Sequence, residues 1–210
     1  MIHPNTELRF ISPEVGYGVV ATRLIPMGTI TWALDGIDRV YAAEEITAMA
    51  PPYREILDKY CYRDSGGGFV LCWDHAKYVN HSFRSSCITT AYNFELAVRD
   101  IHPGEELTDD YGYLNLSEPF EALPEPGTGR TRVMPDDLLR YHGMWDDQLK
   151  EAFRHFLAVD QPLAWLIEPR YRDTVAEVAA GRKAMDSILH CYFDPERAGY
   201  SRSAGREAGS

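Results

Sequence analysis

Short runs of apolar and β-branched residues, separated by Gly, Pro and polar residues, fill the first half of the chain. Such runs are typical of β-strands bounded by turns. They predict strands over 7–11, 19–21, 28–32, 69–73, 88–92 and 94–98. Two short helices are predicted between them at 42–49 and 53–59, the second following Pro51-Pro52. The pattern therefore predicts a compact, mainly β unit over residues 1–116.

The pattern changes after residue 116. Prolines and glycines interrupt any regular element between 117 and 134, which predicts a linker or an ordered surface loop. Beyond it, apolar residues recur at helical spacing over 138–157 and again over 172–191, with a short element at 165–169 between them. The predicted organisation ends with a helical extension over 135–195 and a small, polar tail over 196–210 that we expect to be disordered. The fold class is α+β overall.

Composition places the chain among ordinary soluble proteins. It has 210 residues, of which 45% are hydrophobic and 25% charged. No apolar run approaches the ~20 residues that a membrane helix needs. The N-terminal residues lack the basic and then apolar build of a signal peptide. A cytoplasmic protein without a membrane partner is expected.

Charge and cysteine usage exclude some functions. The net charge of −11 argues against direct binding of nucleic acid, which needs clustered Lys and Arg. It is compatible with a basic peptide or protein as partner, although acidity for solubility explains it equally well. The four cysteines, Cys61, Cys72, Cys87 and Cys191, are scattered without a C-x-x-C pair, so no metal site is expected.

Three short motifs contain the candidate functional residues, and each also has a purely structural interpretation. Gly16-Tyr17-Gly18 lets the backbone pass close to another group, but an isolated G-x-G usually marks a hairpin bend. Asn80-His81-Ser82 has the residue types of a turn. Tyr111, within 104–113, has the position of a strand-end aromatic with a solvated hydroxyl group.

The same region of the sequence contains residue types that occur in two other kinds of site. His81 with Ser82 or Cys87 suggests a hydrolase, but there is no G-x-S-x-G elbow, and adjacent side chains need not meet. Glu105-Glu106 with Asp109-Asp110 offers oxygen ligands for Mg²⁺ or Ca²⁺ at a spacing that fits no familiar loop, so a solvated acidic face is the simpler interpretation.

Taken together and in this order, the three motifs resemble those of the SET-domain protein lysine methyltransferases. The resemblance covers roughly residues 7–115 and suggests a short, bacterial-type member without a cysteine-rich zinc cluster. It implies a β-clip of small sheets, with a pseudoknot in which a C-terminal segment threads through a loop. That threading would bring Asn80-His81 beside 106–111.

The resemblance also implies the activity and its residues. S-adenosylmethionine would bind on one face, and the target lysine of a protein substrate would enter from the other through a narrow channel. Cofactor binding would fall to Gly16, Tyr17, Gly18, Asn80 and His81. Tyr111 would stand at the point of methyl transfer, and Tyr60 and Tyr113 would line the channel. An acidic rim of Glu105, Glu106, Asp109, Glu118 and Glu121 would attract a basic peptide.

Several residues depart from the family pattern. The family usually continues Asn-His-Ser with Cys-x-Pro-Asn, whereas this chain has Phe83-Arg84-Ser85-Ser86, in which Ser86 can still cap a backbone group. A family tyrosine is replaced by Leu34. Since Cys191 is the only cysteine in the last third of the sequence, zinc is not expected. The helical extension would close the channel instead, with Tyr192 or Phe193.

These departures leave a rival open, namely a catalytically idle SET module that grips a basic peptide. The sequence does not identify the substrate protein, the number of methyl groups transferred or the oligomeric state.

Overall fold

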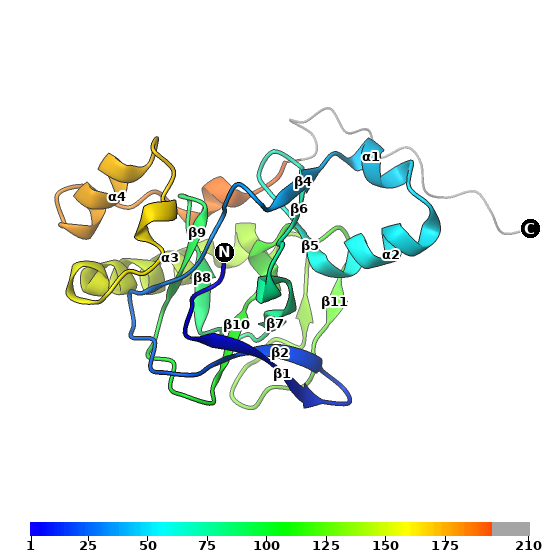
Figure 1. Cartoon of the computed structure of the whole chain (residues 1–210), viewed down its shortest axis with the longest axis horizontal. Helices are drawn as coiled ribbons and strands as arrows, with labels where there is room; N and C mark the ends of the chain where they lie inside the picture. The colour runs from blue at the N-terminus through cyan, green and yellow to red at the C-terminus, as the bar shows by residue number, and fades with distance from the viewer. Residues whose placement is uncertain (195–210) are drawn as a thin grey trace, which may run out of the picture.

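The computed structural model describes residues 1–194 of the chain. Small β-sheets occupy its middle, with α1 and α2 at one end and α3 and α4 at the other (Figure 1). A β-rich first half and a helical second half were predicted, and the structure confirms this division of secondary structure. Among the described residues, no helix combines the length and the apolar character needed to cross a bilayer.

A four-stranded sheet joins three segments that lie far apart in the sequence. Its strand order is β1-β2-β10-β7. β1 and β2 form an antiparallel hairpin, β10 pairs antiparallel with β2, and β7 pairs parallel with β10. The strands are β1 (Thr6–Ser12), β2 (Gly16–Ala21), β10 (Glu106–Asp109) and β7 (Asn80–His81). All three motifs of the sequence therefore lie on neighbouring strands.

A second, three-stranded antiparallel sheet contributes to the hydrophobic core. Its order is β3-β9-β8, with Trp32 paired with Glu95 across β3 and β9. Its strands are β3 (Ile30–Ala33), β9 (Phe94–Ala97) and β8 (Cys87–Thr89). Every residue of β9 is buried, as expected for a central strand covered on both faces.

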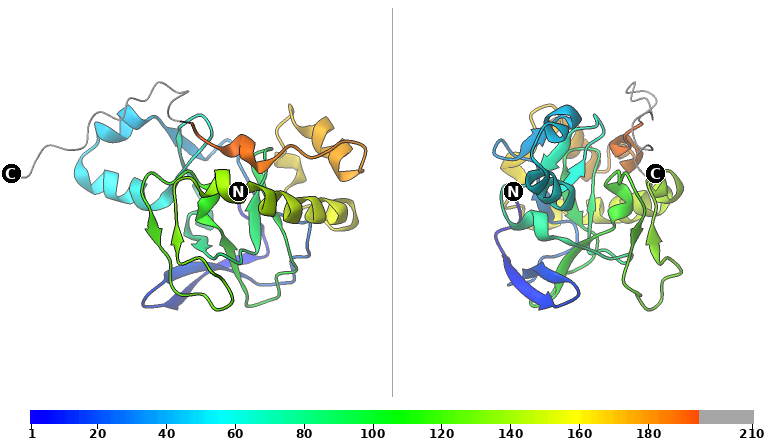
Figure 2. Two further views of the ribbon diagram at one scale, coloured as in Figure 1. Left: turned by 180° about the vertical axis from the view of Figure 1, so that it is seen from behind. Right: turned by 90° about the vertical axis from the view of Figure 1, so that its right-hand side faces the viewer.

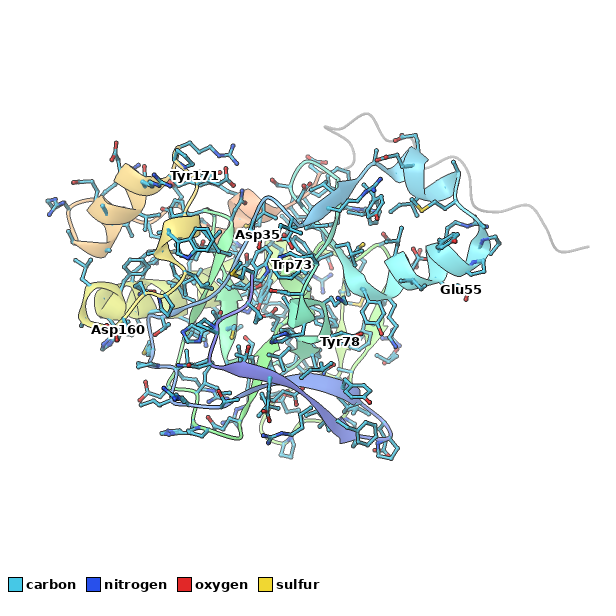
Figure 3. The ribbon with its side chains drawn as sticks, in the orientation of Figure 1. Asp35, Glu55, Trp73, Tyr78, Asp160 and Tyr171 are labelled. Carbon is cyan, nitrogen blue, oxygen red and sulfur yellow. The ribbon has the colours of Figure 1, made fainter. Side chains whose placement is uncertain are left out.

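A third sheet, β4-β6-β5, carries the two short helices at its edge. The elements are β4 (Arg39–Tyr41), α1 (Ala43–Thr47), α2 (Pro51–Tyr60), β5 (Cys61–Arg63) and β6 (Phe69–Leu71). Pro51 occupies the first turn of α2, where its missing N–H costs nothing. In Figure 3, Trp73 lies beside Asp35 just after β6, and its indole N–H donates to that carboxylate at 2.9 Å.

The segment predicted as a linker contains regular structure. β11 (Phe120–Glu121) and β12 (Arg132–Val133) form an antiparallel hairpin, and Val133 is fully buried. The segment 117–134 is therefore ordered in part as a hairpin.

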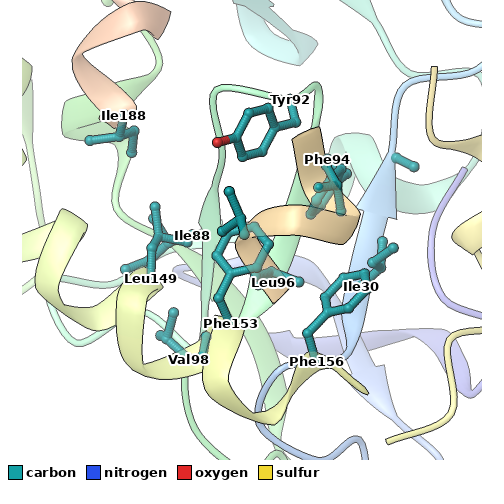
Figure 4. Packing of buried hydrophobic residues seen from close by; sticks show 14 of the residues in the cluster. Ile30, Ile88, Tyr92, Phe94, Leu96, Val98, Leu149, Phe153, Phe156 and Ile188 are labelled. Atoms are coloured by element: carbon teal, nitrogen blue, oxygen red, sulfur yellow. The ribbon is translucent and has the colours of Figure 1, made fainter. Parts of the chain in front are cut away.

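The helical half packs directly on the second sheet. It contains α3 (Asp137–His155) and α4 (Arg172–Ala179), and the described residues also form short 3-10 turns. These turns are η1 (His75–Tyr78) and η2 (Tyr111–Tyr113), which belong to the β-rich half, and η3 (Phe156–Ala158), η4 (Ala164–Leu166) and η5 (Ile188–Cys191). Figure 4 shows Leu149 and Phe153 of α3 facing Ile88 and Leu96 of the sheet. Because one hydrophobic cluster spans both halves, the extension shares its core with the β-rich part.

One predicted helix is wrong in extent. The chain was expected to be helical over 172–191, but α4 ends at Ala179, and Gly181 adopts a left-handed backbone with φ +70°. Glycine takes this conformation without strain and ends helices for that reason. Seen from behind, η5 then lies along α3 (Figure 2), where the Ile188 N–H donates to Asp146 Oδ1 at 2.8 Å. The tail predicted over 196–210, and the last residue of the predicted extension, lie outside the described residues.

Candidate functional site

The first motif and the second meet across β2, β10 and β7. The Asn80 side-chain amide donates to the Tyr17 carbonyl oxygen at 3.0 Å and to Glu106 Oε1 at 2.6 Å. Burial raises the pKa of Glu106, and the hydrogen bond from Asn80 opposes this. The sheet thus places a carboxylate, an amide and a backbone carbonyl group at one point.

Gly18 makes this close approach possible. A Cβ atom at Gly18 would lie 2.8 Å from Asn80 Nδ2 and closer still to Glu106 Oε1. Only glycine leaves room for both side chains there. Gly16 plays a different part, because its φ of +83° forms the tight turn from β1 into β2, and a Cβ there would meet nothing within 4 Å. Tyr17, between them, is exposed and packs edge-on against Tyr78 at 6.4 Å between ring centroids.

Tyr111 is fixed at both ends by the segment that contains Asn80. Its hydroxyl group donates to the Val79 carbonyl oxygen at 2.9 Å, and its backbone N–H donates to His81 Nδ1 at 3.1 Å. Burial, followed by the charges of Asp109 and Glu106, raises the pKa of the phenol, which keeps it protonated at neutral pH. Since its proton is committed to Val79, the oxygen offers its lone pairs to a neighbouring donor.

His81 presents an unpaired donor. Its Nδ1 accepts from Tyr111, so the ring proton lies on Nε2, which is buried and has no partner among the described residues. Burial, and then the Arg130 guanidinium, lower the pKa of His81 to about 4, so the ring is neutral at pH 7. The rings of Phe83, Tyr111 and Phe120 surround it at centroid distances of 4.4, 5.3 and 5.7 Å.

A cavity of about 670 Å³ opens beside Tyr111. It lies between α2 with β5 on one side and residues 114–120 on the other. Six aromatic rings line it: Trp32, Tyr60, Tyr62, Phe69, Tyr111 and Phe120. Tyr60 therefore lies where the sequence predicted a channel wall.

Three residues expected around the channel lie elsewhere. Tyr113 does not line the cavity but is buried in the core, where its hydroxyl group lies 3.0 Å from the Cys87 carbonyl oxygen and 3.1 Å from Asp109 Oδ1. Its aromatic character favours packing against Trp145 at 5.2 Å. Tyr192 and Phe193 do not line the cavity either. Residues 114–120, from the end of the β-rich part and the start of the predicted linker, border it instead.

The departure at Ser85-Ser86 is accommodated. Ser86 is fully buried, and the Thr108 N–H donates to its Oγ at 2.9 Å, while the Ser86 N–H donates to the Thr108 carbonyl oxygen at 3.1 Å. These bonds tie the segment before β8 to β10. The expectation that Ser86 caps a backbone group is confirmed.

The hydrolase arrangement does not form. The Ser82 hydroxyl group donates to Glu125 at 2.9 Å rather than to His81, and Cys87 is 1% exposed, with the pKa of its thiol raised by burial. A buried, protonated thiol and a serine without a base are poor nucleophiles.

Arg130 is a site residue that sequence reasoning missed, because it lies in the predicted linker. Its guanidinium forms ion pairs with Asp110 and with Asp137, the latter at 2.6 Å, and it lies 4.3 Å from the Phe83 ring centroid and 4.5 Å from that of Tyr141. Its side chain is only 15% exposed. Arg130 thereby joins the residue before Tyr111 to the start of α3.

Replacing Arg130 is expected to destabilise the protein strongly. Arg130→Met leaves two buried carboxylates without a cation, which costs about 3 kcal/mol of unfolding free energy. Arg132→Met is the matched control, because Arg132 pairs with Glu121 on the exposed hairpin and should cost less than about 1 kcal/mol. Urea unfolding of both variants measures the difference. Equal, small losses would contradict the role of Arg130.

A pair of buried acids was also missed. Glu95 and Asp109, 8% and 6% exposed, both line the cavity and are hydrogen-bonded to each other. The sequence placed Asp109 on an exposed acidic rim, and this was wrong, since its side chain points inward from β10. Nothing in the local sequence around Glu95 distinguishes it from an exposed strand residue.

A comparison with protein-family models identifies a related domain. Residues 16–112 match the family model of the SET domain. That range begins at Gly16 and ends one residue after Tyr111, so it spans all three motifs. No curated protein matches the chain significantly.

Proposed function

The chain carries a SET domain, and from this premise we propose that it is an S-adenosylmethionine-dependent protein lysine N-methyltransferase. The observation that supports this most strongly is the meeting of Gly18, Asn80 and Tyr111 beside an aromatic cavity. The substrate is a protein or peptide with an accessible lysine.

The residues present fit the cofactor on two counts. Gly18 lets Asn80 and Glu106 approach the Tyr17 carbonyl oxygen, and this group of a carboxylate, an amide and a carbonyl suits the amino-acid end of the cofactor. The unpaired N–H of His81, enclosed by aromatic rings, suits the nitrogen acceptors and flat face of an adenine. When bound, the cofactor would supply a methyl group activated by a sulfonium charge.

The protein's own task is then to position and neutralise an amine. A free lysine with a pKa near 10.4 costs about 4–5 kcal/mol to deprotonate at pH 7. Aromatic walls remove water from the ammonium group and so lower its pKa. The Tyr111 oxygen, whose proton is held by Val79, can accept a hydrogen bond from the amine and orient its lone pair. Positioning of this kind supplies most of the rate of an in-line transfer.

A calorimetric titration of the protein with S-adenosylmethionine tests the proposal. Saturable binding is expected, and Asn80→Ala should weaken it about tenfold or more, because it removes the amide that orders Tyr17 and Glu106. Asn5→Ala, which lies ahead of β1 and outside the site, controls for a general effect of losing an asparagine.

The outcomes of this titration distinguish an active enzyme from a catalytically idle binding module. Binding that Asn80→Ala weakens would support the enzyme, and labelled S-adenosylmethionine would then identify the methylated protein in a cell lysate. If the folded wild type fails to bind the cofactor, the enzymatic proposal fails, and the idle module that grips a basic peptide becomes the better account.

A further inference from the structure

The cavity holds an acidic pair at its inner end. Glu95 projects from the central strand β9 and Asp109 from the end of β10, and both residues belong to the lining that also includes Tyr111. The two are hydrogen-bonded to each other, so one of them carries a proton. The Tyr113 hydroxyl group holds Asp109 at 3.1 Å from below. The pair is thus fixed in place and faces the space where a substrate side chain would lie.

Neither carboxyl group has a salt-bridge partner among the described residues, although the N-terminal ammonium group opposes the rise in the pKa of Glu95, and Lys59, Arg63 and Lys77 also line the cavity. Other buried acids have partners of their own. Asp110 and Asp137 both pair with Arg130, and Asp146 accepts a hydrogen bond from the Ile188 N–H. A buried carboxylate without a counter-ion is costly to keep, which makes the inner end of the cavity incomplete without a positive group.

A second buried group at the same end also lacks a partner. Trp32 is 4% exposed, lies directly opposite Glu95 across β3 and β9, and lines the cavity. Its indole N–H has no acceptor among the described residues. The ring of Tyr62 packs edge-on against it at 6.0 Å. An aromatic box with an acidic floor is the environment that favours an alkylammonium ion.

We propose that the Glu95–Asp109 pair receives the ammonium group of the target lysine and that Asp109 accepts its proton. This inference rests on the proposed methyl transfer and assigns its proton acceptor. One N–H bond of the ammonium group breaks, its electron pair stays on nitrogen, and the proton moves to an Asp109 carboxylate oxygen. The neutral amine then takes the methyl group, whose bonding electrons remain on the cofactor's sulfur, and becomes a secondary ammonium ion.

The surroundings tune the pair for this transfer. Burial raises the pKa of Asp109 to about 7, and burial together with the charge of Asp109 raises that of Glu95 well above its usual value. We assign the proton that the two carboxyl groups share to Glu95, so that Asp109 can gain or lose a proton near neutral pH. A general base works best when its pKa lies near the working pH.

The other titratable groups near the pair do not compete for this role. The N-terminal ammonium group acts on Glu95, and the cavity lining also contains Asp58, Lys59, Cys61, Arg63, Lys77 and Glu118. The buried groups around the pair are Tyr62, Cys72, Cys87, Asp110, Tyr111 and Tyr113. Burial raises the pKa of each of them, so the phenols and thiols are neutral at pH 7, and Asp110 is held by Arg130.

The test uses n-butylamine, labelled with ¹³C next to its nitrogen, as a mimic of the lysine side chain. The probe is titrated at pH 6 and at pH 8 into protein saturated with S-adenosylhomocysteine, and its carbon signal reports binding. The free amine is charged at both pH values, so it should bind the wild type about tenfold more tightly at pH 8, where Asp109 is a carboxylate, than at pH 6. Asp109→Asn should weaken binding at pH 8 about tenfold and remove the dependence on pH, because it removes the titrating carboxylate.

A control variant and the contrary outcomes complete the test. Glu177→Gln removes one negative charge from α4, outside the cavity lining, and should behave as the wild type. A probe that binds the wild type equally at both pH values, that fails to bind cofactor-loaded protein, or that binds Asp109→Asn as tightly as the wild type at pH 8 would overturn the inference. Failure of the wild type to bind the cofactor would instead overturn the proposed function.

Thermal unfolding supplies a readout that does not depend on any ligand. A folded-state pKa of about 7, against 3.8 for the ordinary group, means that the folded protein holds an extra proton between these pH values. The resulting stabilisation is complete below about pH 4 and is lost as the pH rises through 7. Asp109→Asn should therefore raise the melting temperature relative to the wild type more at pH 8 than at pH 5. An equal difference at both pH values would mean that Asp109 does not titrate in this range.

Discussion

Tyr111→Phe is expected to reduce methyl transfer by roughly two to three orders of magnitude while leaving cofactor affinity nearly unchanged. The substitution removes one oxygen atom. That oxygen lies 2.9 Å from the Val79 carbonyl group and faces the cavity, whereas the cofactor contacts proposed above fall on Gly18, Asn80 and His81. An interaction made with the reacting amine lowers the rate when lost, but an interaction with the cofactor would lower its affinity.

The measurement compares two quantities on the same variant. Transfer of a labelled methyl group to the protein acceptor gives the rate, and calorimetry gives the affinity for S-adenosylmethionine. Tyr53→Phe is the matched control, because Tyr53 lies on α2 with 64% of its surface exposed and is not part of the cavity lining. A Tyr111→Phe protein that transfers methyl groups at the wild-type rate would show that the hydroxyl group does not act on the amine.

Much of the architecture could be predicted, because it is encoded in local pattern and motif order. The strands of the first half and the helix α3 follow from hydrophobic periodicity, and the three motifs led to the site through their resemblance to a family. The parallel pairing of Thr108 with Asn80 could be expected only through that resemblance, since neither segment alone indicates its partner.

What escaped prediction depends on contacts between distant segments. Arg130 looks like one more polar residue between Pro and Gly, yet it joins Asp110 to α3. The alternation of polar and apolar residues around Glu95 is that of a strand with one solvated face. Only the packing of β3 and β8 on either side of β9 buries Glu95. Tyr113 was expected in the channel wall because of the family resemblance, but the 3-10 turn η2 directs it into the core. A short turn of this kind changes the direction of side chains within two residues.

Gly18→Ala is expected to have the second large effect, abolishing measurable cofactor binding while the protein still folds. Its new Cβ atom would lie 2.8 Å from Asn80 Nδ2 and even closer to Glu106 Oε1, so both side chains must move. The hydrogen bonds from Asn80 to Tyr17 and Glu106 would then be lost together. At roughly 1 kcal/mol for each bond, with the clash in addition, affinity should fall by more than about thirtyfold.

Gly36→Ala is the control for this substitution. A Cβ atom at Gly36 meets nothing within 4 Å, so the same chemical change is made where there is space for it. Calorimetry on both variants, with circular dichroism to verify folding, measures the effect. Cofactor binding by Gly18→Ala at the affinity of Gly36→Ala would mean that Asn80 and Glu106 need not hold their observed positions, and the cofactor would have to be placed on a different part of the SET domain.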